Sequence, residues 1–178
     1  MTFQETPLAG AYVIDLTPHA DARGFFARGH CVREFAENGI ETRIVQCNVS
    51  FNIHRGTLRG MHYQLSPKAE PKLVRCTRGA IFDVIVDLRA DSPTHRKWFG
   101  LEMSADNHRQ LFIPIGLAHG FVTLADDSEV FYQMGEFFSP EHARGVRWND
   151  PAFNIVWPVE PTMISNKDQG YPDYIATP

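Results

Sequence analysis

The sequence predicts an all-β protein built as a sandwich or barrel of short strands. Short apolar runs alternate with turn residues along most of the 178-residue chain, and 12% of the residues are aromatic, including 13 Phe. This spacing is typical of all-β domains. The length suits one domain, and no repeat or Pro/Gly/Ser-rich linker divides the chain. We therefore expect a single domain over residues 1–178.

The expected elements follow from local composition, taken in chain order. Residues 11–16 (AYVIDL) form the first apolar run, and residues 31–38 (CVREFAEN) predict a helix that Gly39 ends. A short helical turn is expected beyond Pro158. The remaining runs are rich in apolar and β-branched residues, as strands are; they are residues 43–51, 72–78, 80–88, 97–103, 110–113, 120–124, 128–135 and 153–157.

Alternation within these runs assigns side chains to faces. In residues 80–88, Asp83 and Asp87 lie on the face opposite to the apolar residues Ala80, Phe82, Val84, Val86 and Leu88. In residues 43–51, Gln46, Asn48 and Ser50 share one face.

Two polar residues share a face with apolar ones. Lys72 lies on the side of Val74 and Cys76, and Tyr132 on the side of Val130. Burial in a dry core is unfavourable for both, so either they line a cavity, or Lys72 reaches solvent at a strand end and Tyr132 bonds a backbone group.

Composition excludes several classes of protein. The formal charge of −4 argues against a nucleic-acid binder, and no apolar run approaches the ~20 residues that span a membrane. The N-terminus lacks the basic and apolar regions of a signal peptide. The three cysteines show no CxxC spacing, which indicates reduced thiols. We expect a soluble, cytoplasmic protein.

Two histidines have surroundings unlike the polar neighbourhoods of the others. His62 lies in LRGMHYQ, and His119 completes a P-x-G-x-x-H pattern with Pro114 and Gly116. That pattern resembles the second motif of the cupins, jelly-roll barrels that hold a ligand at the mouth. A metal-binding cupin supplies an H-x-H pair in its first motif, where this chain has His62-Tyr63-Gln64. Two imidazoles fall short of a catalytic metal site, so we expect no metal.

Without a metal, the side chains themselves must supply the chemistry. A His accepts a proton near neutral pH, a Lys stabilises an oxyanion, and a Tyr hydroxyl donates a proton. These three groups around one cavity suit proton abstraction beside a carbonyl, with return of the proton on the other face. The residues therefore indicate a cofactor-independent epimerase or isomerase.

Ordered motifs along nearly the whole chain add a family resemblance. They are D-x-R-G-F-F at 21–26, V-Q-x-N-x-S at 45–50, L-R-G-M-H-Y-Q at 58–64, K-L-V-R at 72–75, D-S-P-T at 91–94, I-P-x-G-x-A-H-G-F at 113–121, W-N-D-P at 148–151 and S-x-K-D at 165–168. The chain resembles the dTDP-4-dehydrorhamnose 3,5-epimerase family. This resemblance implies a cupin-type double-stranded β-helix (jelly-roll barrel) with an N-terminal arm and short peripheral helices. It also implies a nucleotide-linked 4-keto-6-deoxy sugar as substrate.

The resemblance assigns roles position by position. It makes His62 the base, Asp168 the carboxylate that orients it, Lys72 the stabiliser of the enolate oxygen and Tyr132 the acid. It implies a homodimer in which the N-terminal arm reaches the neighbouring subunit. The residues it implies in substrate binding are Arg23, Phe26, Arg28, Gln46, Asn48, Arg59, His119, Phe138 and Lys167.

Three positions depart from the family pattern, all near the implied nucleotide subsite. Arg28 replaces a usual Glu, Ala143 a common acidic residue, and Phe138 a Tyr that stacks on the base. They leave the preferred base open, and they leave epimerisation of one carbon as the alternative to epimerisation of both. Two further alternatives are a metal-dependent cupin, disfavoured by the missing H-x-H, and a non-catalytic binder, disfavoured by the full acid–base set.

Overall fold

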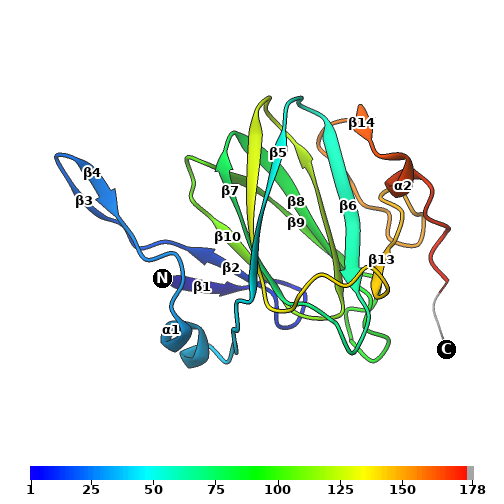
Figure 1. Ribbon diagram of the computed structural model, residues 1–178, viewed down its shortest axis with the longest axis horizontal. Coiled ribbons are helices and arrows are strands. Elements are labelled where there is room, and N and C mark those ends of the chain that lie inside the picture. Colours follow the sequence, from blue (N-terminus) through cyan, green and yellow to red (C-terminus); the bar gives the residue numbers. More distant parts are fainter. Residues whose placement is uncertain (176–178) are drawn as a thin grey trace.

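The chain folds into two β-sheets that face each other, in a computed structural model that describes residues 1–175 (Figure 1). Each sheet has its own strand order, and neighbouring strands within it run antiparallel. The first sheet has six strands in the order β1-β2-β10-β7-β12-β5, namely β1 (Thr2–Glu5), β2 (Tyr12–Asp15), β10 (Gln110–Ile113), β7 (Lys72–Arg78), β12 (Ser128–Met134) and β5 (Gln46–Asn52).

The second sheet has the order β13-β6-β11-β8-β9, and β14 pairs in parallel with Thr57 and Leu58 of β6, away from the end of β6 that pairs with β13. A separate hairpin and two short helices lie outside the sheets. These elements are β13 (Ala143–Gly145), β6 (Thr57–Gln64), β11 (Leu117–Thr123), β8 (Ala80–Asp87), β9 (Trp98–Ser104), β14 (Met163–Ile164), the hairpin of β3 (His19–Asp21) with β4 (Gly24–Phe26), α1 (Val32–Glu37) and α2 (Asn166–Gln169). Within the described residues, neither helix is long enough to cross a membrane.

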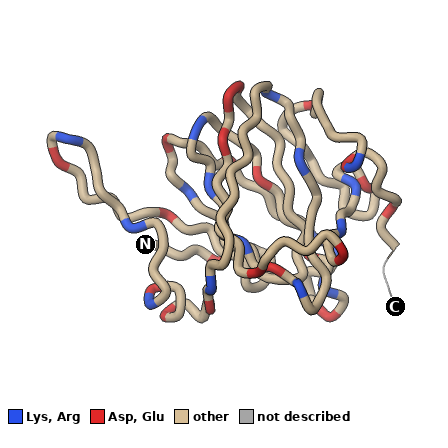
Figure 2. Tube along the Cα trace, in the orientation of Figure 1, with Lys and Arg blue, Asp and Glu red and all other residues tan. Residues whose placement is uncertain are grey.

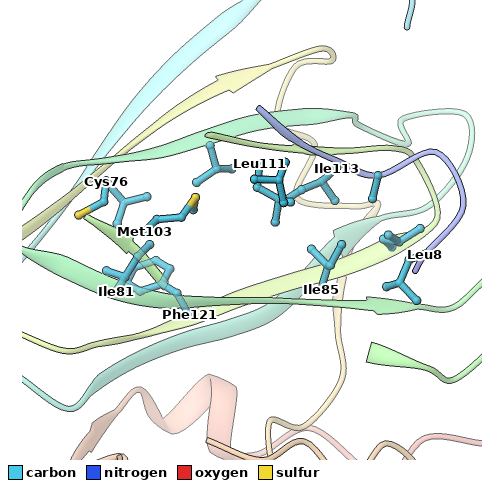
Figure 3. Packing of buried hydrophobic residues seen from close by; sticks show 13 residues of the cluster. Leu8, Cys76, Ile81, Ile85, Met103, Leu111, Ile113 and Phe121 are labelled. Atoms are coloured by element: carbon cyan, nitrogen blue, oxygen red, sulfur yellow. The ribbon is translucent and has the colours of Figure 1, made fainter. Parts of the chain in front are cut away.

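Side chains from both sheets meet in a buried core (Figure 3). On β7, Cys76 and Val74 point into this core; two residues further along the same face, Lys72 reaches a cavity. On β11, Phe121 packs in the core, and His119, two residues before it, lines the cavity. The period of two in a strand thus places polar residues at one end of a largely apolar interior. The core comprises Leu8, Ala11, Val13, Val74, Cys76, Ile81, Ile85, Met103, Leu111, Ile113, Leu117, Phe121 and Val130.

The outer faces of the sheets are covered as well. Phe35 of α1 packs on Phe112 and Leu73 of the first sheet. Phe153 and Trp157 pack on the outer face of the second sheet, against Met61, Phe82, Val84, Val86 and Ala118 among others. The apolar face predicted for residues 80–88 is therefore the outer one, and Asp83 points into the barrel.

Most predicted elements are confirmed with shifts at their ends. The helix predicted at 31–38 is α1, with Cys31 and Asn38 as its caps and Gly39 after it at φ 73°. The helical turn expected beyond Pro158 is α2. The three cysteines are unpaired, as expected.

The structure differs from the prediction at one expected strand and at six strands that were not predicted, namely β1, β3, β4, β6, β13 and β14. The strand predicted at 153–157 is wrong: its alternating apolar residues cover the second sheet as an irregular segment, and Asn154 adopts a φ of 52°, which interrupts extended backbone. No strand was predicted over residues 57–64, where β6 lies. Arg59 and Gly60 obscure its alternation, and β6 is defined by its pairing with β11, β13 and β14.

The loop after β8 is organised by one buried carboxylate. Asp87 accepts hydrogen bonds from Arg89 Nε at 2.9 Å, Ser92 Oγ at 2.5 Å and Thr94 Oγ1 at 2.7 Å. Burial alone would raise the pKa of Asp87, but these bonds lower it from 3.8 to about 2. The resulting stabilisation is present above pH 3.8 and is lost as the pH falls toward 2.

We therefore expect Asp87→Asn to lower the free energy of unfolding at pH 7 by about 2 kcal/mol in urea titrations. The difference from the unmodified protein should shrink below pH 4. The exposed Asp91→Asn is the matched control, with a change within about 0.5 kcal/mol. An Asp87 variant as stable as this control would contradict the account.

Candidate active site

A cavity of about 610 Å³ opens between the two sheets beside the core. Strands β5, β6, β7, β11 and β12 supply its walls, and the segment of β14 and α2 closes one side. Its lining residues that the sequence singled out are Asn48, Arg59, His62, Lys72, His119, Tyr132, Lys167 and Asp168.

His62 and Asp168 form a hydrogen-bonded pair on one wall. His62 Nε2 donates to Asp168 Oδ1 over 2.6 Å, and the His62 side chain is 42% exposed while that of Asp168 is 6% exposed. In the neutral imidazole, a proton on Nε2 leaves Nδ1 as the nitrogen able to accept one. The pair thus joins an accessible base to a buried carboxylate.

Asp168 is held from several sides. It lies in α2, where its backbone N–H donates to the capping Ser165 Oγ at 3.1 Å, and its Oδ2 accepts the Gly60 N–H at 3.4 Å. Burial alone would raise the pKa of Asp168, but the hydrogen bond and charge of His62 and the Gly60 bond hold it below its usual value. The carboxylate therefore stays ionised and keeps the imidazole oriented.

The glycine two residues before His62 allows two strands to approach closely. Gly60 has φ 134°, and a Cβ there would lie 2.5 Å from the Cα of Gly120. The register of β6 and β11 shifts at this point, so that His62 and His119 become direct cross-strand partners. Both imidazoles consequently reach the same cavity.

Lys72 and Tyr132 come from the opposite sheet. Lys72 is the first residue of β7. Tyr132 lies on β12, where it pairs with Asn48 of the neighbouring strand β5. The first of the two readings left open by the sequence is correct: both line the cavity. Burial, followed by the negative charge of Asp83, raises the pKa of Tyr132 well above its usual value. Its hydroxyl therefore keeps its proton and is available as a donor.

A second His–carboxylate pair was missed by sequence reasoning. His119 Nε2 lies 3.0 and 2.9 Å from the two carboxylate oxygens of Asp83, and both side chains are buried. Burial raises the pKa of Asp83 against the opposing effects of His119 and Lys72. The available signal was that Asp83 shares a face with Ile81 and Ile85, which marks that face as buried too.

Other predicted residues lie around the cavity. Arg59 Nε donates to Asn52 Oδ1 at 2.7 Å, which fixes the guanidinium at the wall. Gln46 Oε1 accepts the backbone N–H of Phe138 at 3.3 Å. Phe138, 58% exposed, lines a second cavity of about 290 Å³ whose walls also include His62, Lys72 and Lys167. Gln46 and Phe138 thus lie beside the main cavity rather than in its lining.

Arg23, Phe26 and Arg28 lie away from this cavity. The β3–β4 hairpin that carries Arg23 and Phe26 projects from the barrel (Figure 1). The Arg23 side chain is 90% exposed and paired with Asp21, Phe26 is 77% exposed, and Arg28 pairs with Glu34 at 2.7 Å. These residues do not reach the cavity of their own chain.

The charges are mixed in sign. Lys and Arg are interspersed with Asp and Glu along the trace (Figure 2). Among the described residues, no three His, Cys, Asp or Glu side chains gather as a metal site requires. Each imidazole of the cavity faces a carboxylate instead.

Two facing antiparallel sheets with a polar cavity between them define a cupin-type jelly-roll protein. A family model described as dTDP-4-dehydrorhamnose 3,5-epimerase matches residues 5–175. The dTDP-4-dehydrorhamnose 3,5-epimerase of Sinorhizobium fredii is 43% identical over 179 residues, which cover 100% of this chain and 92% of that protein. The chain belongs to the dTDP-4-dehydrorhamnose 3,5-epimerase family, whose members are isomerases.

Solved structures agree with this assignment. A crystal structure of the enzyme from Bacillus anthracis, with TDP and PPi bound, matches with a TM-score of 0.94 and 43% identity, covering 97% of this chain and 99% of that one. ChmJ, a 3'-monoepimerase from Streptomyces bikiniensis in complex with dTDP-quinovose, matches with a TM-score of 0.87 and 32% identity, covering 94% and 85%. The jelly-roll fold is thereby confirmed.

Proposed function

We propose that the protein epimerises carbons 3 and 5 of a dTDP-linked 4-keto-6-deoxy sugar without a cofactor. The observation that carries the proposal is the meeting of the His62–Asp168 pair with Lys72 and Tyr132 in one cavity. A base, a cation and a neutral hydroxyl are the groups needed to move a proton beside a keto group. Family membership supports the nucleotide-sugar substrate.

The proposed reaction moves one proton at a time. His62 Nδ1 takes the proton from the carbon beside the keto group, and the electron pair of the C–H bond moves into an enolate. The ammonium of Lys72 stabilises the negative charge on the enolate oxygen. The Tyr132 hydroxyl protonates the same carbon from the opposite face; Tyr132 then regains a proton from water and His62 releases one. Repetition at the second carbon completes the conversion.

Side chains near the cavity suit the rest of the substrate. Arg59 and Lys167 supply positive charge for the diphosphate, and Asn48 and His119 supply polar contacts to the sugar. Phe138 offers an exposed ring for stacking on the nucleotide base, and its backbone N–H donates to Gln46 Oε1. Under this proposal the nucleotide lies toward the smaller cavity.

The base preference is testable because Arg28, Phe138 and Ala143 depart from the family pattern. We expect dTDP to bind at least about tenfold more tightly than GDP or CDP in calorimetric titrations at one salt concentration. Tighter binding of GDP or CDP would contradict the dTDP assignment. If turnover labels only carbon 3 or carbon 5, the protein is a mono-epimerase, the activity that ChmJ is named for.

We further propose a homodimer in which the N-terminal arm completes the neighbour's site. Arg23 and Phe26 project on the β3–β4 hairpin without reaching their own cavity. The edge strand β5 exposes Val49 and Phe51 at its outer face, and Ile53 follows directly after it, with exposed fractions of 61%, 44% and 61%. An unpaired edge with apolar side chains favours association with a second copy.

Complementation tests the arm directly. Arg23→Ala and His62→Ala variants should each be inactive or nearly so as homodimers. A mixed dimer contains one cavity with both an intact His62 and an intact partner arm, so mixing and refolding the two variants should restore activity. Two tags identify the mixed dimer. Mixed dimers without activity, or a monomer in analytical ultracentrifugation, would contradict the proposal.

A further inference from the structure

Glu70 forms a buried ion pair with the proposed enolate-stabilising lysine. Glu70 Oε1 lies 2.9 Å from Lys72 Nζ, and the two side chains are 6% and 7% exposed. Both line the smaller cavity, and Lys72 also lines the larger one. Glu70 is therefore at the smaller cavity alone, whereas Lys72 borders both.

The local sequence E-P-K produces this arrangement. A residue before proline is restricted to extended backbone, and proline fixes its own φ, so Glu70 and Lys72 project to the same side. Pro71 is held in turn by its carbonyl, which accepts the Gly135 N–H at 2.9 Å, and by close packing of its ring on Gly135. The pair thus rests on a fixed backbone.

The pair is poorly arranged for stability alone. Within residues 1–175, the buried Glu70 Oε2 receives no hydrogen bond. Burying a carboxylate without its full set of donors is unfavourable, and such pairs are often no more stable than apolar residues of the same size. A contribution to function would explain the arrangement better than a contribution to folding.

The effect on Lys72 follows from the geometry. A lysine side chain has four rotatable bonds and is therefore poorly positioned unless its ammonium is held. Here Nζ lies between Glu70 Oε1 and the backbone carbonyl of His62, which is 3.5 Å away. The second contact places the ammonium at the backbone of the residue that carries the proposed base.

From these contacts we propose that Glu70 is a positioning residue that holds the Lys72 ammonium at the point where the enolate oxygen develops. The inference rests on the proposed function. Glu70 does not touch the reacting atoms; it acts through Lys72. Its loss should therefore lower kcat, because stabilisation of the transition state weakens, without raising KM.

The test compares two variants with different abilities to hold a lysine. Glu70→Ala should lower kcat by about tenfold or more, with KM unchanged or lower. Glu70→Gln keeps an oxygen that accepts from Lys72 Nζ and should retain at least about half of kcat. The exposed Glu141→Gln makes the same change in charge outside both cavities and should match the unmodified protein.

Coupling to Lys72 separates positioning from a general structural effect. In a Lys72→Met background, adding Glu70→Ala should change the rate of deuterium exchange into substrate less than about twofold. An undiminished loss in that background would overturn the inference, as would Glu70→Ala kinetics equal to those of the unmodified protein. If the unmodified protein itself exchanges no deuterium, the proposed function fails instead.

Discussion

Replacing His62 by alanine should lower kcat for epimerisation by about 10²–10⁴-fold, the contribution typical of a positioned general base. The cavity, the Lys72 ammonium and the Tyr132 hydroxyl remain, so KM should change little. Deuterium exchange at both carbons should fall together with turnover, because in the proposed mechanism proton removal by His62 precedes every later step.

The matched control is His54→Ala, which removes an exposed ring outside the cavity and should leave kcat within about twofold. The kcat of Asp168→Asn should lie between those of His62→Ala and His54→Ala. The imidazole remains in this variant but loses the carboxylate that orients it at 2.6 Å. Substantial exchange by the His62 variant would show that another group removes the proton.

Replacing Tyr132 by phenylalanine should separate proton exchange from epimerisation. The proposed removal of the proton by His62 should stay intact, and the same group can return a solvent deuteron to the face it left. Label should therefore still enter the substrate, while formation of the inverted sugar falls by about 10²-fold or more. NMR of the sugar in D2O resolves the two outcomes in one sample.

Tyr12→Phe is the matched control for this variant. Tyr12 lies on β2, packs against the buried cluster around Phe35 and lines neither cavity, so loss of its hydroxyl should leave both rates unchanged. If Tyr132→Phe inverts the sugar at the normal rate, a water molecule or another group donates the final proton.

Strand alternation predicted a good part of this site. The apolar neighbours Val74 and Cys76 placed Lys72 toward the interior, and Val130 did the same for Tyr132; the structure brings both to one cavity. These inferences worked because period two is a local property of the backbone. The same reasoning assigned Asp83 to a polar face, since alternation alone does not show that a second layer covers the other side of the strand.

Other features depend on contacts between distant segments. The approach of Asp168 to His62 joins α2 to β6 across more than a hundred residues, and only the family resemblance indicated it. Strand β6 was not predicted, because its pairing with distant strands defines it. The ion pair of Glu70 with Lys72 was not predicted, because the sequence does not show which residues surround Glu70. Conversely, residues 153–157 carry a strand-like pattern but cover the outer face of the second sheet without joining it. Their apolar side chains are buried there, and burial alone does not require hydrogen bonds to a neighbouring strand.

The most direct test of the central claim is solvent exchange by the unmodified protein. Incubated in D2O with dTDP-4-keto-6-deoxyglucose and followed by NMR, it should incorporate deuterium at both carbon 3 and carbon 5 as the inverted sugar appears. Label at one carbon only would limit the enzyme to that position. Absence of label at both carbons would contradict the assignment of His62, Lys72 and Tyr132 as an epimerase site for this substrate.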